Sequence, residues 1–237
     1  VELLHGMADA GADIIELGIP FSDPMVDGPV IQRAAERALE HHVSLSIVLK
    51  MVGEFRKTND HTPIILMGYV NPIEAYGYER FSNDAVAAGV DGVITVDLPP
   101  NPMNETVALF KKAGLDPIFL IAPTTKEDRI KEICAAASGF VYYVSLNGVT
   151  GAAGINVAAV TERLNLIRKY TDLPLGVGFG IGDGASAAKV GKVADAVIIG
   201  SAMIKRLEAA MERGDQAMVD ATSGFTEELR LALDKQD

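Results

Sequence analysis

The feature that most constrains the fold of this chain is a short unit that recurs along it. In each copy an Ala-Gly pair ends a helical pattern, an Asp follows two residues after the Gly, and an apolar run comes next, at residues 10–18, 88–96 and 113–121. Glycine is favoured just after a helix because the backbone enters the left-handed region there. The apolar runs lack polar alternation, as expected for strands covered on both faces. The unit therefore predicts a helix followed by a buried strand.

Four further apolar runs continue the series, at residues 64–68, 140–144, 175–178 and 196–199, with helical patterns between them. Strict alternation of helix and strand predicts a parallel sheet, and a series of this length favours a closed α/β barrel over an open sheet. A complete barrel has eight strands and ~250 residues, whereas this sequence of 237 residues starts in a helical pattern. We expect a single domain, residues 1–237, with seven readable strands and no first strand. Either the chain is truncated, or another segment replaces that strand.

Composition narrows the classes of function. The formal charge is −11, from 21 basic and 32 acidic residues, which argues against a nucleic-acid surface. A phosphorylated substrate stays possible, because helix N-termini bind phosphate without basic side chains. The one cysteine, Cys134, lies in an apolar helical stretch, so we expect a buried structural thiol and a reducing, cytoplasmic location. Membrane insertion is not expected, since a span needs ~20 apolar residues.

Glu16 is the most informative polar residue, because it lies inside the first apolar run. A buried carboxylate is costly unless it is paired or protonated. One interpretation is a core glutamate satisfied by a tyrosine or a backbone N–H. The other is a general acid/base whose pKa is raised by burial. In a barrel, the carboxyl ends of the strands carry the active site, which favours the second.

The loop that follows this strand, residues 21–29, contains two prolines, a glycine and three polar groups. Asp27 stands just before the next predicted helix, so it is either an N-cap or a second functional carboxylate. Asp23, before Pro24, is either a turn residue or part of a functional surface.

Glycine-rich segments follow three late strands, at residues 148–151, 176–182 and 199–202. The loops after the last two strands of a barrel, with a short helix N-terminus, commonly bind phosphate. Each glycine cluster alone is compatible with an ordinary turn, but three at consecutive strand ends predict a phosphate site.

The placement of lysines and histidines excludes several barrel chemistries. None of the lysines follows a predicted strand, which argues against a Schiff-base aldolase. None of the four histidines does either, which argues against a zinc aldolase and leaves no expected metal site. Carboxylate acid/base chemistry on a phosphate ester remains.

Residues 16–29, ELGIPFSDPMVDGP, closely resemble the signature of tryptophan synthase alpha chains. The resemblance continues in order through residues 67–72, 97–99, 122–124, 142–151, 178–181 and 200–202, and covers essentially the whole chain. It implies a (β/α)8 TIM barrel and a lyase that splits indole-3-glycerol phosphate into indole and glyceraldehyde 3-phosphate. It also implies a role in tryptophan biosynthesis.

The resemblance implies roles for residues on both halves of the site. Glu16 would be the acid/base that protonates indole C3, Asp27 would accept the indole N–H, Tyr142 would orient the catalytic carboxylate, and Tyr69 would line the indole pocket. The substrate and phosphate contacts would come from Thr150, Gly151, Phe179, Gly180, Gly200 and Ser201, with Thr150 on a lid that reaches Asp27.

The resemblance further implies an α2β2 assembly with a tryptophan synthase beta subunit that holds pyridoxal phosphate, and no cofactor in this chain. Asp23 and Pro24, near Met25 on the Asp27 loop, are the expected interface. Two alternatives stay open: a non-catalytic activating subunit, and another phosphate-binding barrel enzyme. An assay for indole release separates all three.

Overall fold

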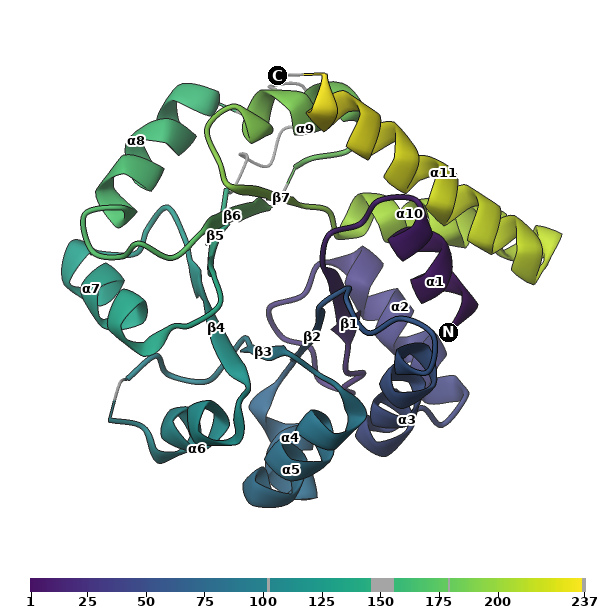
Figure 1. The fold of residues 1–237 in the computed structure, drawn as a ribbon, viewed down its shortest axis with the longest axis horizontal. Coiled ribbons are helices and arrows are strands. Elements are labelled where there is room, and N and C mark those ends of the chain that lie inside the picture. The colour runs from purple at the N-terminus through teal and green to yellow at the C-terminus, as the bar shows by residue number, and fades with distance from the viewer. Residues whose placement is uncertain (102, 146–155, 179, 236–237) are drawn as a thin grey trace.

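The computed structural model describes residues 1–101, 103–145, 156–178 and 180–235, and its parallel strands curl around a central space with the helices outside (Figure 1). The sheet order follows the chain from β1 to β7. The strands are β1 Ile15–Gly18, β2 Ile64–Gly68, β3 Gly92–Thr95, β4 Asp116–Ile121, β5 Val141–Val144, β6 Leu175–Gly178 and β7 Ala196–Ile198. Each lies within about a residue of a predicted run, so the parallel barrel architecture with seven readable strands is confirmed.

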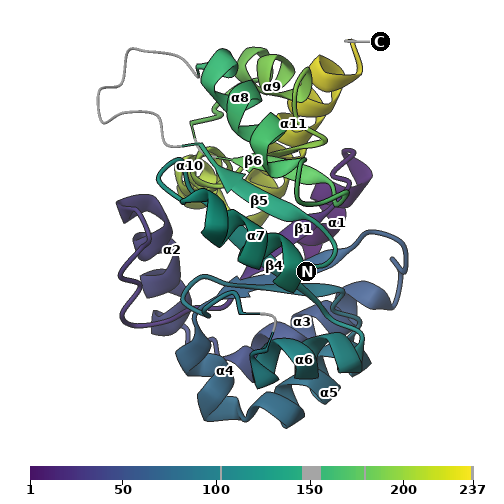
Figure 2. The same cartoon turned by 90° about the vertical axis from the view of Figure 1, so that its left-hand side faces the viewer.

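Helices alternate with the strands and cover the outside of the sheet (Figures 1 and 2). They are α1 Glu2–Asp9, α2 Pro29–Glu40, α3 Leu45–Arg56, α4 Val70–Tyr76, α5 Tyr78–Ala88, α6 Glu105–Ala113, α7 Glu127–Ala136, α8 Val157–Ile167, α9 Gly184–Gly191, α10 Ser201–Ala210 and α11 Asp215–Asp234, with a short 3-10 helix at Met211–Arg213. The predicted glycines after helices are confirmed: Gly11, Gly89 and Gly114 have φ of 97°, 89° and 97°.

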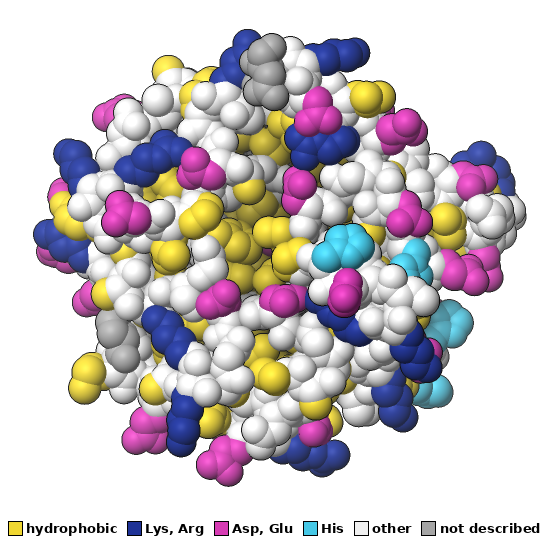
Figure 3. Space-filling model, viewed as in Figure 1, with side chains coloured by type: hydrophobic (Ala, Val, Ile, Leu, Met, Phe, Trp, Pro, Cys, Tyr) yellow, Lys and Arg dark blue, Asp and Glu magenta, His cyan; other side chains and the backbone are white. Residues whose placement is uncertain are grey.

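The two faces of the sheet carry different side chains. The outward face packs against the helices and forms the main core, with Phe55, Phe81 and Phe110 almost fully buried. The inward face forms a smaller apolar cluster: Ile65, Met67, Ile94, Val96, Ile118, Leu120, Phe140, Tyr142, Val144 and Ile198. Viewed down the barrel, apolar side chains gather in a hollow at the centre, with charged side chains around it (Figure 3). Glu16 therefore lies on a face whose other side chains are mostly apolar.

Small residues make room inside the sheet. A methyl group added at Gly92 would lie 2.8 Å from the Asp116 carbonyl oxygen, and one at Gly176 would lie 2.8 Å from Ile198 Cδ1. At Gly178 it would overlap the Tyr142 hydroxyl. These contacts explain the glycine-rich strand β6: the large inward side chains of β5 and β7 occupy the space that β6 leaves free.

Three further features bear on the expectations from sequence. Cys134 is 8% exposed, and burial raises the pKa of its thiol, as predicted for a structural cysteine. Within the described ranges, no helix is both long and apolar enough to cross a membrane. In the same part of the chain, no three His, Cys, Asp or Glu side chains come together as a metal site.

Candidate active site

Glu16 lies in the middle of β1, in register with Ile65 of β2, so its side chain shares the inward face with the apolar cluster. Its carboxylate forms no hydrogen bond or ion pair with any described residue. Burial raises the pKa of Glu16 from 4.5 to about 7. Within the described ranges, no tyrosine or backbone N–H satisfies Glu16 as the alternative of a core glutamate would require. A carboxyl group with a pKa near neutrality can both give and take a proton.

Tyr142 lies on the inward face with Glu16 and interacts with it electrostatically. It is 6% exposed on β5, in register with Gly176, and its hydroxyl points toward Gly178. Burial first, and the negative charge of Glu16 second, raise the pKa of Tyr142 well above its usual value. The phenol therefore keeps its proton and is a donor within electrostatic reach of Glu16. Its predicted role in orienting the carboxylate is compatible with this placement.

Asp27 is held in the loop between β1 and α2 by short-range main-chain hydrogen bonds. The Asp27 N–H donates to the Pro24 carbonyl at 3.1 Å, and Gln32 Nε2 donates to the Asp27 carbonyl at 2.8 Å. The N-cap of α2 is Gly28, and no side chain caps that helix. The interpretation of Asp27 as an N-cap is thus wrong, and its carboxylate does not bind the end of that helix.

Tyr69, the residue directly after β2, binds this loop and so connects it to the sheet. Its buried hydroxyl accepts a hydrogen bond from the Val26 N–H at 3.1 Å, and its ring packs on Phe21 with centroids 5.4 Å apart. Burial raises the pKa of Asp27, and hydrogen bonding to the Tyr69 hydroxyl opposes that rise. Tyr69 therefore positions Asp27. The resemblance had placed Tyr69 only in the indole pocket and did not indicate this contact.

Asp23 is exposed on the same loop, and its side chain accepts a hydrogen bond from Ser22 Oγ at 2.5 Å. The Met25 N–H donates to the main-chain carbonyl of Asp23 at 2.9 Å, so Asp23 takes part in a tight turn through its backbone and not through its side chain. Met25 and Val26 are 89% and 68% exposed, which leaves an apolar tip on the loop.

The glycine-rich half of the site contains two helix N-termini with different surroundings. The N-terminus of α9 is occupied by its own cap: Asp183 accepts from the Ser186 N–H at 2.7 Å, and Ser186 Oγ accepts from the Asp183 N–H at 3.2 Å. The N-terminus of α10 has Gly200 at the N-cap and no side-chain cap. Apart from its two chain neighbours, a methyl group at Gly200 would meet no atom of a described residue within 4 Å. The open, uncapped end of α10, with the exposed Ser201, is the one that suits an anion.

The other phosphate candidates fall into two groups. Gly180 is exposed and has φ of 77°, a conformation that favours glycine. Thr150, Gly151 and Phe179 lie outside the described residues.

Sequence reasoning missed a structural carboxylate after β3. Asp97 Oδ1 accepts a hydrogen bond from the Val70 N–H at 2.7 Å, and so holds the first turn of α4 just beyond Tyr69. The available signal was an acidic residue directly after a predicted strand.

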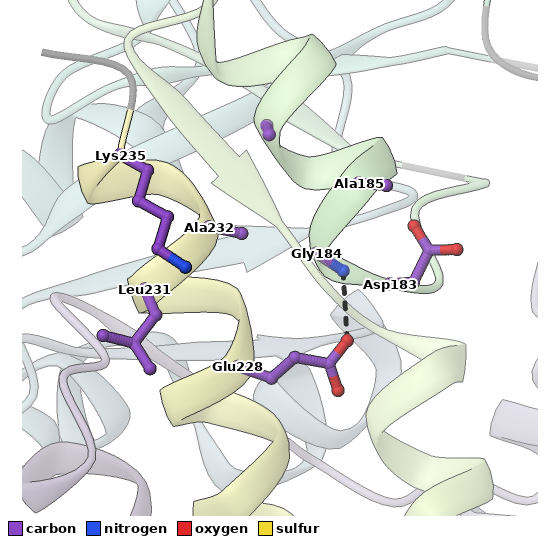
Figure 4. A pocket seen from close by; sticks show the side chains of 8 residues that line it. Asp183, Gly184, Ala185, Glu228, Leu231, Ala232 and Lys235 are labelled. Atoms are coloured by element: carbon purple, nitrogen blue, oxygen red, sulfur yellow. Dashed lines mark hydrogen bonds between the residues drawn. The ribbon is translucent and has the colours of Figure 1, made fainter.

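A groove of about 610 Å³ lies in the helical layer, between α9 and α11 (Figure 4). Glu228 Oε1 in this groove accepts a hydrogen bond from the Gly184 N–H at 3.2 Å. The first turns of α9 and the C-terminal part of α11 line it, and neither Glu16 nor Asp27 is among its lining residues.

Comparison with known proteins agrees with this geometry. The family model for the tryptophan synthase alpha chain matches residues 1–232. The tryptophan synthase alpha chain of Thioalkalivibrio sulfidiphilus is 59% identical over 234 residues, which cover 99% of this chain and 88% of that protein. That of Methylococcus capsulatus is 52% identical, covering 99% and 87%.

Solved structures give the same result. Tryptophan synthase subunit alpha from Legionella pneumophila str. Paris superposes with a TM-score of 0.89 and 44% identity, covering 98% of this chain and 86% of that one. A structure of the tryptophan synthase α2β2 complex from Pyrococcus furiosus contains a chain with a TM-score of 0.86 and 35% identity, covering 96% and 90%. With a family model that spans nearly its whole length and relatives this similar, the chain belongs to the tryptophan synthase alpha chain family.

Proposed function

We propose that Glu16 and Asp27 carry out the lyase reaction of this family, the cleavage of indole-3-glycerol phosphate into indole and glyceraldehyde 3-phosphate. The observation that carries this assignment is the position of Glu16 on the apolar inward face, where it pairs with no described residue and has a pKa of about 7. The apolar side chains around it suit an indole ring, and the uncapped end of α10 suits the phosphate of the same substrate.

The proposed reaction is a retro-aldol cleavage in which the protonated indole ring accepts the electron pair of the C–C bond that breaks. Protonated Glu16 gives its proton to C3 of the ring, and the Asp27 carboxylate stabilises the positive charge at the ring N–H. Ionised Glu16 then removes the proton of the hydroxyl on the carbon attached to C3. The O–H electron pair forms the aldehyde C=O, the C–C bond breaks, and its electrons return to the ring. Glu16 ends protonated, as it began.

The direct test is indole release from indole-3-glycerol phosphate by the purified chain, alone and with a tryptophan synthase beta subunit. Indole production supports the assignment. A chain that only stimulates the beta subunit and releases no indole would instead be a non-catalytic activator.

For the phosphate site, we expect Gly200→Ala to raise the KM for indole-3-glycerol phosphate strongly and to leave the melting temperature of the free protein nearly unchanged. The added methyl meets open space among the described residues, so its effect should fall on the ligand. Gly200 is a cleaner choice than Gly180, where any side chain would strain the backbone. Thermal unfolding with and without glycerol 3-phosphate measures binding separately from catalysis.

Gly53→Ala on α3 is the matched control, because a methyl there also meets open space. If glycerol 3-phosphate protects the Gly200 variant as well as the parent, the α10 end is not the phosphate site.

The partner in this proposal is the beta subunit, in an α2β2 assembly like that of the Pyrococcus furiosus complex, with the pyridoxal phosphate held by the beta subunit and no cofactor in this chain. Asp23, Pro24 and the exposed Met25 form the proposed contact, since they share the loop of Asp27. Docking there would bias the position of Asp27.

We therefore expect glycerol 3-phosphate to tighten binding of the beta subunit, since such coupling is reciprocal. Calorimetric titration with and without this ligand measures the effect, and Asp23→Ala should reduce it. Equal affinities in both titrations, with no change in the variant, would remove the case for a communicating loop.

A further inference from the structure

Helices α2 and α10 contact each other at the periphery of the molecule, although they follow β1 and β7, the two end strands of the described sheet (Figures 1 and 2). Each helix starts at one half of the proposed site: α2 just after Asp27, and α10 at Gly200. Contact between these helices therefore connects the acid/base half of the site to the phosphate half.

One carboxylate joins the two helices. The carboxylate of Glu208, on α10, accepts two hydrogen bonds from Arg33, one from Nε at 3.3 Å and one from Nη2 at 3.1 Å. It accepts a third from Nη1 of Arg37 at 2.8 Å. The two arginines are four residues apart on α2 and so lie on the same face of that helix. The bonds to Arg33 and Arg37 lower the pKa of Glu208, so the carboxylate is ionised at neutral pH.

Glu208 does not stabilise its own helix through the helix dipole. It lies in the last turn of α10, where the helix dipole favours a cation. The side chains of Glu208 and Arg37 keep 20% and 28% of their surface exposed, and that of Arg33 keeps 50%. Exposed ion pairs of this kind contribute little to overall stability. They do, however, join helices that follow opposite ends of the described sheet.

Helix α2 depends on such an external contact. None of its residues is fully buried, and most of its apolar residues are half-buried, so packing alone holds it less firmly than a core helix. Gln32, next to Arg33, donates to the Asp27 carbonyl at 2.8 Å. A continuous series of contacts thus runs from Gly200 along α10 to Glu208, across to Arg33 and Arg37, and through Gln32 to Asp27.

We propose that Glu208 is a positioning residue: through Arg33 and Arg37 it fixes α2, and with it Asp27, relative to the phosphate-binding end of α10. The inference rests on the proposed function, since it needs phosphate at α10 and catalysis by Asp27. Phosphate binding would order α10 and, through Glu208, the loop that carries Asp27.

The first test is kinetic and uses Glu208→Gln in the whole chain. We expect kcat to fall about 10- to 100-fold, the range that misplacing a catalytic group produces, with unchanged affinity for glycerol 3-phosphate. In an Asp27→Asn background the same substitution should have no further effect, because both changes act through one group. A purely structural role would lower the melting temperature and add to the loss from Asp27→Asn.

The second test needs no turnover. Hydrogen exchange should show that glycerol 3-phosphate protects amides of both α10 and α2 in the parent, and only those of α10 in Glu208→Gln. Glu132→Gln is the matched control, since it removes an ion pair of 2.7 Å to Arg129 within α7 alone.

The outcomes separate the two proposals. A parent chain that releases no indole contradicts the proposed function. An active parent with unchanged kcat in Glu208→Gln, and with α2 still protected by glycerol 3-phosphate, contradicts only the role of Glu208.

Discussion

Replacing Glu16 by glutamine should lower the turnover of indole-3-glycerol phosphate at least ~100-fold, because the variant has no group to give a proton to C3 or to take the hydroxyl proton. Glutamine keeps the size of the side chain, and the uncapped end of α10 is unaffected. Glycerol 3-phosphate should therefore still raise the melting temperature of the variant as it does that of the parent. Steady-state kinetics and thermal unfolding measure the two effects. Turnover near that of the parent would rule out the proposed mechanism.

The same substitution should change how stability depends on pH. Burial raises the pKa of Glu16 from 4.5 to about 7, so between these values the folded state holds a proton that the unfolded state has lost. The stabilising contribution of protonated Glu16 is complete below pH 4.5 and is lost as pH rises to about 7. At 1.36 kcal/mol per pKa unit, the total loss is roughly 3 kcal/mol.

Glutamine does not titrate, so this decline should be absent in Glu16→Gln. Urea unfolding at pH 5 and at pH 8 measures it. Glu227→Gln, which changes an exposed glutamate on α11, serves as the control. A decline of equal size in parent and Glu16→Gln would show that Glu16 titrates normally.

Replacing Asp27 by asparagine should also lower turnover at least ~100-fold, because the neutral amide cannot stabilise positive charge on the ring. Tyr69→Phe should have a smaller effect, about 10-fold, since a hydrogen bond to a charged group contributes about 1.5 kcal/mol. The two losses should not add fully, because Tyr69 acts through the loop that holds Asp27.

Asp60→Asn is a suitable control, since Asp60 is an exposed carboxylate just before β2, at the opposite ends of the strands. Turnover like that of the parent in Asp27→Asn would leave Glu16 as the only essential carboxylate. Fully additive losses would show that Tyr69 acts independently of Asp27.

The sequence by itself determined the elements of the fold and the main candidates for catalysis. In the repeated unit, the glycine after the helix and the apolar run after that glycine located Gly89, Gly114 and the strands that follow them, because these signals depend on neighbouring residues. Glu16 stood out for the same reason: a carboxylate inside an apolar strand is anomalous wherever the strand packs.

Only the tertiary structure decided how these candidates are used. Register and curl of the sheet bring Tyr142 to the same face as Glu16, and a hydrogen bond from Val26 to Tyr69 holds the Asp27 loop. Local sequence could not show that Gly28, and not Asp27, caps α2, since both precede the helix.

The two arginines of α2 and Glu208 show the same limit most clearly. In the sequence they are ordinary charged residues of two amphipathic helices, and nothing in their spacing connects them. They meet because the sheet curls until the helices after its first and last described strands come into contact. Contacts between segments this far apart depend on the packing of the whole chain, and local sequence patterns do not encode them.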